Sequence, residues 1–368
     1  MRVMQIITRV NRGGTARWIE VLTTGLAEHN IDSDLVAGIV QKDEIEDPAF
    51  EKFHGIRING LGRSVSLFTD LRALIEIRRK IVKHKPDVIN THTSKAGALG
   101  RLAAFSLGRN RPAVVHTFHG HLLYGYFSPL KRKLLVLIES FLSHMTDIYI
   151  SSGSIVRDDL IAAGIGKESE YIVVKPGIPD LIKASRSEVR TKFEISEAAV
   201  VVGWLGRMVE IKRPDRALEV ARLNPEIIFL IAGAGELLQD LKVTAPSNVI
   251  FSGWSTPEEI WAASDIALLT SENEAQPISL IEAGYAALPC VAMGVGSVSE
   301  VIENGKTGNV AKDVNALSNY ISELAGDLEK RTRFGENARK KMLHEFSVDA
   351  FISGHINAYE RALEKRSQ

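Results

Sequence analysis

The stretch SENEAQPISLIEAGYAALP, residues 271–289, carries two carboxylates, Glu274 and Glu282, with seven residues between them. The apolar run 266–270 before it predicts a short buried strand. Proline is favoured at a first helical position, where its missing N–H costs nothing, so Pro277 predicts that a helix follows. The stretch therefore predicts a strand, a loop that carries Glu274, and a helix that carries Glu282 one to two turns in.

The start of this predicted helix is suited to binding an anion. The first backbone N–H groups of a helix have no partner within it, so we expect those of Ile278 and Ser279 to face a ligand above the strand. Carboxylates accept hydrogen bonds strongly, so Glu274 and Glu282 suit the hydroxyls of a sugar. A phosphate site beside a polyol site indicates a nucleotide sugar.

A second stretch, WLGRMVEIKRPDRAL at 204–218, points to the same ligand. It follows an apolar strand and places Arg207 and Lys212 at the carboxyl end of that strand, where ligands bind in open α/β sheets. Cations are mildly disfavoured near a helix N-terminus, which favours a bound anion over plain surface charge. The two cations could neutralise a diphosphate leaving group.

Short apolar runs alternate with helical patterns along the whole chain. Such alternation predicts an α/β protein with parallel sheets and helices on both faces. The expected strands are 3–8, 87–91, 113–118 and 147–151 in a first sheet, and 199–205, 227–232, 249–252, 266–270 and 290–293 in a second. Apolar residues at helical spacing predict one amphipathic helix before Pro86, marked by Leu67, Leu71, Leu74, Ile75, Ile81 and Val82.

The domain boundary is expected near residues 175–188, which hold two prolines and a glycine before a polar run. Each side of this segment carries a full set of strand and helix patterns. The sequence therefore predicts an N-terminal domain at 1–178 and a C-terminal domain at 179–347.

Together these motifs resemble the retaining family-4 glycosyltransferases, which have the GT-B fold of two Rossmann-like parallel-sheet domains facing across a cleft. The matching pieces are Gly206-Arg207-x4-Lys212, Gly253 in FSGW, Glu274-x7-Glu282, GVGSVSEVIENGKTG at 294–308, NRGGTARW at 11–18 and HTFHGH at 116–121. The resemblance spans nearly the whole chain. It implies that a last helix, about 348–368, packs back onto the N-terminal domain.

The resemblance also implies roles for single residues of the C-terminal domain. Glu282 would hold the ribose hydroxyls, Glu274 would touch the donor sugar, and Arg207 and Lys212 would stabilise the departing diphosphate. The remaining donor contacts would come from Gly253, Ala275, Gln276, Pro277 and Ile278. Gln276 departs from the pattern, because an aromatic or other bulky residue is common there, which leaves the donor sugar open.

In the N-terminal domain the resemblance implies that His119 reaches the donor sugar near the reacting carbon. Gly13 and Gly14 follow the first strand, where glycine permits a tight turn or a close approach to a donor. No Cys or carboxylate near His119 completes a metal site, and no metal or other cofactor is expected. The DxD-like Asp32-Ser33-Asp34 is interpreted as a turn before a strand.

Two segments are candidates for the acceptor or for a membrane. Ser94 and Lys95 open a predicted helix, either as a plain capped start or as a site for an acceptor phosphate. Residues 128–142 predict a helix whose first turn carries Lys131, Arg132 and Lys133. Its apolar stripe faces either the protein core or an anionic membrane surface; the stripe comprises Leu130, Leu134, Leu137, Ile138, Phe141 and Leu142.

Composition limits the class of protein. Hydrophobic content of 45% and charged content of 24% are ordinary for a soluble globular protein, and the formal net charge is zero. Residues 1–180 hold 24 Lys+Arg against 19 Asp+Glu, a net charge of +5 that suits an anionic partner. The single cysteine, Cys290, excludes an internal disulfide, and no signal peptide or membrane-spanning run is expected. We expect a cytoplasmic protein. Peripheral contact with the inner face of the membrane is a further expectation.

The sequence thus predicts a metal-independent retaining glycosyltransferase. It would move a hexose or N-acetylhexosamine from a nucleotide diphosphate sugar, by expectation UDP-linked, to a saccharide or lipid-linked acceptor. Three alternatives stay open: a soluble small-molecule acceptor, a two-lobed sugar-binding protein without catalysis, and an NAD-dependent oxidoreductase. The last needs an intact glycine fingerprint, but the stretch at Gly233 and Gly235 has Leu238 in place of its third glycine. No nucleic-acid partner is expected.

Overall fold

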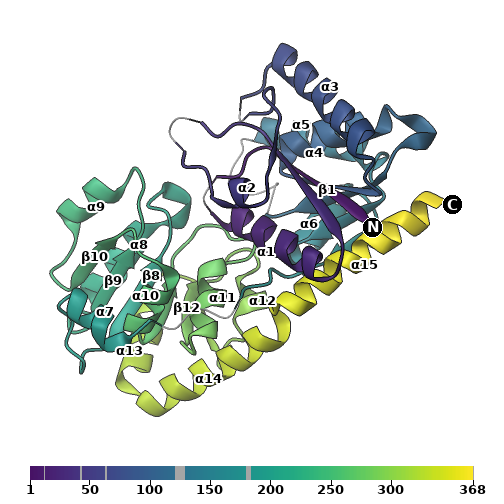
Figure 1. Cartoon of the computed structure of the whole chain (residues 1–368). Helices are drawn as coiled ribbons and strands as arrows, with labels where there is room; N and C mark the ends of the chain where they lie inside the picture. Colours follow the sequence, from purple (N-terminus) through teal and green to yellow (C-terminus); the bar gives the residue numbers. More distant parts are fainter. Residues whose placement is uncertain (12, 42–43, 63, 121–128, 180–183, 368) are drawn as a thin grey trace. The chain divides into compact units, whose positions relative to one another are not determined.

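The structure is a computed structural model that describes every residue except 12, 42–43, 63, 121–128, 180–183 and 368. The chain divides into two compact units. Unit 1 comprises Met1–Gly177 together with Val348–Gln368, and unit 2 comprises Ile178–Ser347. In Figure 1 the sequence colours show that the last helix, in yellow, belongs with the purple and blue N-terminal elements.

Unit 1 is built on a parallel sheet that has seven strands among the described residues, in the order β3-β2-β1-β4-β5-β6-β7. The strands are β1 (Arg2–Ile7), β2 (Asp32–Ala37), β3 (Ile56–Arg57), β4 (Val88–His92), β5 (Ala113–Phe118), β6 (Ile148–Ser151) and β7 (Tyr171–Val173). The helices are α1 (Gly14–Glu28), α2 (Ala49–Lys52), α3 (Leu67–His84), α4 (Ser94–Phe105), α5 (Pro129–Ser143), α6 (Ser154–Ala162) and α15 (Val348–Ser367).

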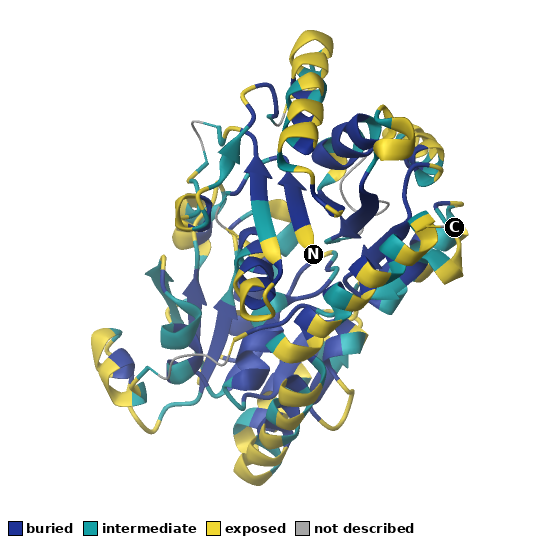
Figure 2. Ribbon diagram, turned by 45° about the vertical axis from the view of Figure 1, so that its right-hand side comes forward, coloured by how far each residue is buried: buried dark blue, intermediate teal, exposed yellow. Residues whose placement is uncertain are grey.

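Helices cover both faces of this sheet, because successive strand residues point to opposite sides. Val3 packs in one apolar core with residues of α1 and α15, which contact each other (Figure 1). Its neighbour Met4 packs in a second core with residues of α3 and α4. Figure 2 shows the strands of the sheets as mostly buried.

Unit 2 is built on a second parallel sheet, with six strands in the described part of the chain, in the order β10-β9-β8-β11-β12-β13. The strands are β8 (Val201–Leu205), β9 (Ile228–Ala232), β10 (Val249–Gly253), β11 (Ile266–Leu269), β12 (Cys290–Met293) and β13 (Gly308–Ala311). The helices are α7 (Arg186–Lys192), α8 (Pro214–Leu223), α9 (Leu238–Thr244), α10 (Pro257–Ala263), α11 (Ile278–Tyr285), α12 (Val298–Val301), α13 (Val314–Gly326) and α14 (Leu328–Glu345).

The predicted fold class is confirmed: both units are doubly wound α/β structures with parallel sheets. Every strand of the two predicted sets is present within one or two residues at its ends. Neither set contains β2 or the short edge strands β3, β7 and β13, although a strand was expected after Asp34. The interpretation of Asp32 and Asp34 as a turn is wrong, because both lie in β2, where Asp34 contacts His84 and Asp32 contacts Arg2.

The apolar stripe predicted for α3 is present, but most of it does not face the core. The buried side chains of α3 are Ala73, Ile77 and Ile81. Leu67 and Leu71 are 82% and 56% exposed. The helix therefore has a buried apolar face and an exposed apolar face, and the sequence pattern does not distinguish them.

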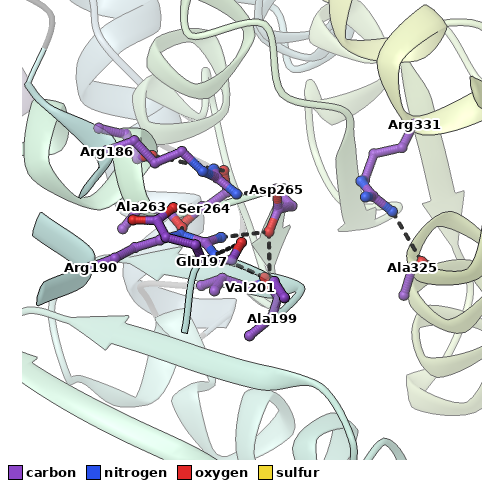
Figure 3. Close-up of polar contacts among 12 residues, drawn as sticks. Arg186, Arg190, Glu197, Ala199, Val201, Ala263, Ser264, Asp265, Ala325 and Arg331 are labelled. Carbon is purple, nitrogen blue, oxygen red and sulfur yellow. Dashed lines mark hydrogen bonds and ion pairs between the residues drawn. The ribbon is translucent and has the colours of Figure 1, made fainter. Parts of the chain in front are cut away.

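An ion network around the buried Arg190 fixes the amino ends of β8 and β11 in unit 2 (Figure 3). Asp265, the residue before β11, accepts hydrogen bonds from Arg190 at 2.9 Å, from Arg186 at 2.7 Å and from the backbone N–H of Val201 at 2.8 Å. Arg190 is fully buried, and its remaining N–H groups donate to backbone carbonyls, including that of Ala199 at 2.9 Å. This network lies at the strand ends opposite to the predicted ligand site.

Replacing Asp265 by Ala is expected to destabilise unit 2 by about 3–5 kcal/mol, because it leaves the buried Arg190 charge without a carboxylate. Chemical denaturation followed by tryptophan fluorescence measures this change. Glu303→Ala is the control, since Glu303 pairs with Lys306 on the surface and its loss is expected to change stability by less than ~0.5 kcal/mol. Equal destabilisation by both variants would contradict the assignment.

Candidate active site

The loop after β8 carries the two predicted cations of unit 2. Gly206 and Arg207 follow the strand directly, and a 3-10 turn, Glu210–Lys212, brings the chain to α8. Arg213 then adopts a left-handed conformation with φ of 48°, and Pro214 begins α8 at its first position, where proline is favoured. The cations therefore lie at the carboxyl end of β8, as predicted.

Hydrogen bonds join this loop to the loop after β11. The N–H of Glu272 donates to the carbonyl of Ile211 at 2.8 Å. The hydroxyl of Thr270 donates to the carbonyl of Lys212 at 3.1 Å and accepts from the indole N–H of Trp204 at 2.9 Å. These bonds hold Lys212 beside the residues that follow β11.

Lys212 and Glu274 form a direct ion pair at the joined loops. The Lys212 Nζ lies 2.5 Å from the Glu274 Oε1, which also accepts from the Ser271 hydroxyl at 2.6 Å. The side chain of Glu274 is 9% exposed, and that of Lys212 is 24% exposed. The ammonium therefore compensates a largely buried carboxylate and still reaches the surface.

The backbone of Glu274 is fixed from the opposite side by residues after β12. Its carbonyl accepts from the N–H of Ser297 at 3.0 Å. Gly296 has φ of 49°, and a Cβ there would lie 1.9 Å from the Glu274 carbonyl oxygen. Glycine at 296 therefore permits the close approach that positions Glu274.

Helix α11 begins at Ile278, four residues after Glu274, and Pro277 is its N-cap residue rather than its first helical residue as predicted. The first hydrogen bond to the cap comes from Leu280, so the N–H groups of Ile278 and Ser279 precede the helical ladder. Glu282 is 4% exposed and lies in the second turn of α11. The predicted sequence of strand, Glu274 loop and helix with Glu282 is present.

Gln276 is held in one orientation beside this helix start. Its Nε2 donates to the Glu300 carboxylate at 3.2 Å, and its side chain is 8% exposed. Because the carboxylate accepts only, the amide oxygen must point away from Glu300. That oxygen is buried without a partner among the described residues, so it is available to a ligand hydroxyl or N–H.

Glycines bring the carboxyl ends of β8, β9 and β10 close together. Gly233 has φ of 135°, and a Cβ there would lie 1.9 Å from the carbonyl oxygen of Gly206. The N–H of Gly233 donates to the carbonyl of Gly253 at 2.8 Å, and Gly253 itself has φ of 71°. These contacts give Gly233 a packing role and agree with the rejection of a dinucleotide fingerprint.

Arg207 differs from Lys212 in its surroundings. Its side chain is exposed and makes no ion pair with any residue that the structure describes. Unit 2 thus brings together an unpaired guanidinium, a paired ammonium, the N-terminus of α11 and two buried carboxylates. This arrangement can bind a phosphate group next to a polyol.

The predicted donor residues of unit 1 are Gly13, Gly14 and His119. Gly13 caps α1 with φ of 149°, and Gly14 begins that helix; both are exposed.

His119 follows β5, and its Nε2 lies 2.8 Å from Nδ1 of His92. Burial, with a smaller effect of His355, lowers the pKa of His119 to about 3, so its imidazole is neutral at neutral pH. His121 lies outside the described residues.

Lys95 already has partners in unit 1. Its Nζ lies 2.5 Å from the carboxylate of Asp70 and 2.5 Å from the carbonyl oxygen of Ser64. Ser94 begins α4, and Thr93 is the N-cap residue but gives no side-chain cap. Instead the Thr8 hydroxyl accepts from the N–H of Ala96 at 3.2 Å. A phosphate at this helix start would compete with Asp70 for Lys95.

Helix α5 carries its basic turn and most of its apolar stripe on the surface. Lys131, Arg132 and Lys133 are exposed. Leu130, Leu134, Leu137, Ile138 and Phe141 are between 41% and 79% exposed, whereas Leu142 is buried. The buried ion pair of Glu139 with Arg101 of α4, at 2.8 Å, attaches the helix to the unit. The alternative that the whole stripe faces the core is therefore wrong.

Comparison with known proteins identifies the fold and the family. The model for glycosyl transferases group 1 matches residues 185–341, and the model for glycosyltransferase family 4 matches residues 12–180. The crystal structure of HepE from Anabaena in complex with UDP superposes with a TM-score of 0.81 at 19% identity, covering 98% of this chain and 100% of that one. The fold is therefore GT-B.

Two relatives by sequence come from bacteria. UDP-Gal:alpha-D-GlcNAc-diphosphoundecaprenol alpha-1,3-galactosyltransferase of Escherichia coli is 28% identical over 312 residues, 78% of this chain and 79% of that protein. Capsular polysaccharide biosynthesis glycosyltransferase CapM of Staphylococcus aureus is 23% identical over 304 residues, 77% of this chain and 79% of that protein. The chain belongs to the family-4 glycosyltransferases.

Proposed function

We propose that this glycosyltransferase is a retaining enzyme that takes a hexose or N-acetylhexosamine from a UDP-sugar. The acceptor is a saccharide or a lipid-linked saccharide, and the pathway is polysaccharide or glycolipid synthesis. The observation that carries the proposal is the Lys212–Glu274 pair at the start of α11, with Glu282 in the same helix. The names of the relatives support it, since one acts on a diphosphoundecaprenol-linked sugar and the HepE structure holds UDP.

The proposed chemistry is transfer with charge stabilisation on the leaving diphosphate. The bond from the sugar C1 to the diphosphate oxygen breaks, and a bond from C1 to the acceptor oxygen forms on the same face. The acceptor proton passes to an oxygen of the donor's own phosphate. Arg207, Lys212 and the N–H groups at the start of α11 stabilise the charge that develops on the diphosphate.

Glu274 is assigned to the sugar and not to nucleophilic attack. Its Oε1 already accepts from Lys212 and Ser271, so this oxygen is engaged in hydrogen bonds and is not free to attack the sugar C1. The free amide oxygen of Gln276 is assigned to the same sugar. Glu282 is assigned to the ribose hydroxyls, as the family resemblance implies.

The experiment that tests this proposal offers the protein a panel of nucleotide sugars with lipid extracts and soluble saccharides. Mass spectrometry of the products names both substrates, and release of UDP over time shows turnover. Transfer to a soluble acceptor alone would favour the small-molecule alternative. UDP binding without turnover would favour a sugar-binding protein, and preferential binding of NAD would favour an oxidoreductase.

Activity is expected to persist in excess EDTA, because Arg207 and Lys212 supply the positive charge that a metal ion supplies in other transferases. Initial rates with and without EDTA measure this. A further sample receives manganese after EDTA treatment. If EDTA abolishes the rate and manganese restores it, the charge assignment to the two cations is wrong.

Contact with an anionic membrane surface is proposed as the way in which the enzyme meets a lipid-linked acceptor. The support is the exposed apolar stripe of α5 next to Lys131, Arg132 and Lys133. In the part of the chain that the structure describes, no helix has the length and apolar character needed to span a bilayer. Attraction is worth ~1 kcal/mol per basic residue near the surface, so docking should be weak and reversible.

Co-sedimentation with anionic vesicles is therefore expected at low salt, with release at high salt. Changing Lys131, Arg132 and Lys133 to Glu is expected to abolish it and to leave UDP binding intact. The matched control changes the exposed basic residues Lys242, Lys312 and Lys340 of unit 2 instead. If the wild-type protein does not co-sediment with anionic vesicles at low salt, the membrane proposal is wrong.

A further inference from the structure

A chain of buried polar side chains in unit 1 begins on α15 and ends at His119. The hydroxyl of Tyr359 accepts from Gln5 Nε2 at 3.1 Å and from Asn90 Nδ2 at 3.0 Å. Gln5 Oε1 lies 2.7 Å from His92 Nε2, and His92 Nδ1 lies 2.8 Å from His119 Nε2. Gln5, Asn90, His92 and Tyr359 are all fully buried. Water therefore cannot replace a missing partner in this chain.

The two histidines of this series of hydrogen-bonded side chains, His92 and His119, are neutral. Burial, followed by the effect of His119, His355 and His116, holds the pKa of His92 well below its usual range. The pKa of His119 is lowered in the same way. A neutral imidazole has one N–H donor and one bare nitrogen acceptor, so a proton placed on one nitrogen fixes the role of the other.

The distances fix the orientation of the Gln5 amide. Its contact with the Tyr359 hydroxyl, at 3.1 Å, has the ordinary length of an N–H···O bond and is long for O–H···O. Its contact with His92, at 2.7 Å, suits an oxygen acceptor. Asn90 is oriented in turn by Thr117, whose hydroxyl donates to Asn90 Oδ1 at 2.9 Å. Gln5 therefore presents its oxygen to His92.

The orientation of the Gln5 amide determines which ring nitrogen carries the proton, first in His92 and then in His119. His92 must donate from Nε2 to the Gln5 oxygen, which leaves its Nδ1 bare. His119 must then donate from Nε2 to that bare nitrogen. The proton of His119 is thus on Nε2, and its Nδ1 is a hydrogen-bond acceptor.

The backbone beside His92 is strained, which is common where a functional group must be held in place. Thr93 has φ of 66° and ψ of 155°, a combination that non-glycine residues rarely adopt. The hydroxyls of Thr93 and Thr8 lie 2.6 Å apart. Trp18 packs edge-on against the ring of His119, with ring centres 4.9 Å apart. The packing therefore restrains the rings as well as their protons.

We infer that Gln5, oriented by Tyr359, acts through His92 to hold His119 in the Nε2–H tautomer, so that its Nδ1 accepts a hydrogen bond from a substrate hydroxyl. Gln5, His92 and Tyr359 are positioning residues in this inference, and His119 is the group that touches substrate. The part that concerns substrate rests on the proposed function. The tautomer itself is a property of the protein without ligand.

Nitrogen NMR of protein labelled with ¹⁵N-histidine tests the tautomer directly. A bare imidazole nitrogen resonates far downfield of a protonated one, and the signals of His119 are assigned by their loss in His119→Gln. The expected result is a bare Nδ1 and a protonated Nε2 at neutral pH. A protonated Nδ1 in the wild type would overturn the inference, whatever the activity.

Two substitutions of Gln5 test whether this residue controls the tautomer of His119. Gln5→Leu removes the oxygen acceptor, so His92 is expected to donate from Nδ1 instead and His119 to move its proton to Nδ1. Gln5→Glu keeps an oxygen facing His92, and the wild-type tautomer is expected to be retained. An unchanged His119 tautomer in a folded Gln5→Leu protein would overturn the role of Gln5.

Tyr359→Phe provides a second route if Gln5→Leu does not fold. It removes the hydroxyl that orients Gln5, and a mixture of both His119 tautomers is expected. Tyr171→Phe is the matched control, because it removes the hydroxyl of another buried tyrosine, which donates to the Ile165 carbonyl at 2.9 Å. A single wild-type tautomer in both proteins would contradict the role of Tyr359.

Kinetics then connect the tautomer to substrate. Gln5→Leu is expected to lower kcat/KM roughly 10-fold or more, as for loss of a group that orients a functional histidine, and Gln5→Glu to restore most of it. The Kd for UDP is expected to stay unchanged. Full activity in a Gln5→Leu protein whose His119 has switched tautomer would show that the substrate contact is wrong while the tautomer control stands.

Discussion

Arg207→Ala is expected to lower turnover by ~100-fold, or about 3 kcal/mol of transition-state stabilisation, as for loss of a preorganised group that stabilises developing charge. Stability is expected to be unchanged, because the Arg207 side chain is exposed and has no ion-pair partner among the described residues. Initial rates at saturating donor measure the first effect, and thermal unfolding measures the second.

The control for this variant is Arg222→Ala. Arg222 is also an exposed arginine of unit 2, but it lies in α8 and donates to the carbonyl of Thr244. Its replacement is expected to leave turnover within twofold of the wild type. If Arg207→Ala turns over as fast as Arg222→Ala, the guanidinium does not act on the leaving group.

Lys212→Ala is expected to reduce both turnover and stability. Turnover should again fall ~100-fold, because the second cation is lost. Stability should fall by about 1–3 kcal/mol, because Glu274 stays largely buried without the ammonium that it contacts at 2.5 Å. Rates at saturating donor and the free energy of unfolding separate the two effects.

A double variant, Lys212→Met with Glu274→Gln, distinguishes them further. It removes both charges and keeps the side-chain volumes, so most of the lost stability is expected to return while turnover stays low. Recovery of turnover along with stability would mean that neither the Lys212 ammonium nor the Glu274 carboxylate is needed for transfer.

The local part of the site could be predicted from the sequence. The apolar run 266–270, Pro277 and the two carboxylates lie within twenty residues, and short-range patterns determine strand, loop and helix there. The structure moves only the helix start, by one residue at Pro277. The cations of the β8 loop were predicted for the same reason.

The pairing of side chains from distant segments could not be predicted in this way. Lys212 and Glu274 are 62 residues apart, and their contact depends on β8 and β11 being neighbours in the sheet. Gln5 and Tyr359 are 354 residues apart, and neither carries a local signal of function. The need for glycine at Gly296 follows from its positive φ and from its close approach to the Glu274 carbonyl, both of which depend on the folded structure.

The exposed apolar residues of α3 and α5 show a different limit. Periodicity shows that Leu67 and Leu71, or Leu134 and Phe141, share a face of a helix, but not whether that face is covered. In α3 the side chains that pack in the core are Ala73, Ile77 and Ile81, and only Ile81 belongs to the predicted stripe. Small side chains such as Ala73 weigh little in a hydrophobic pattern, so the larger exposed residues dominated the interpretation.

The anomeric configuration of the product tests the central proposal most directly. With a UDP-sugar of α configuration, proton NMR of the product formed by the wild-type protein reports whether the new linkage is α or β. Retention predicts an α linkage, with one UDP released for each sugar transferred. A β linkage, or UDP release without transfer to any acceptor of the panel, would contradict the account.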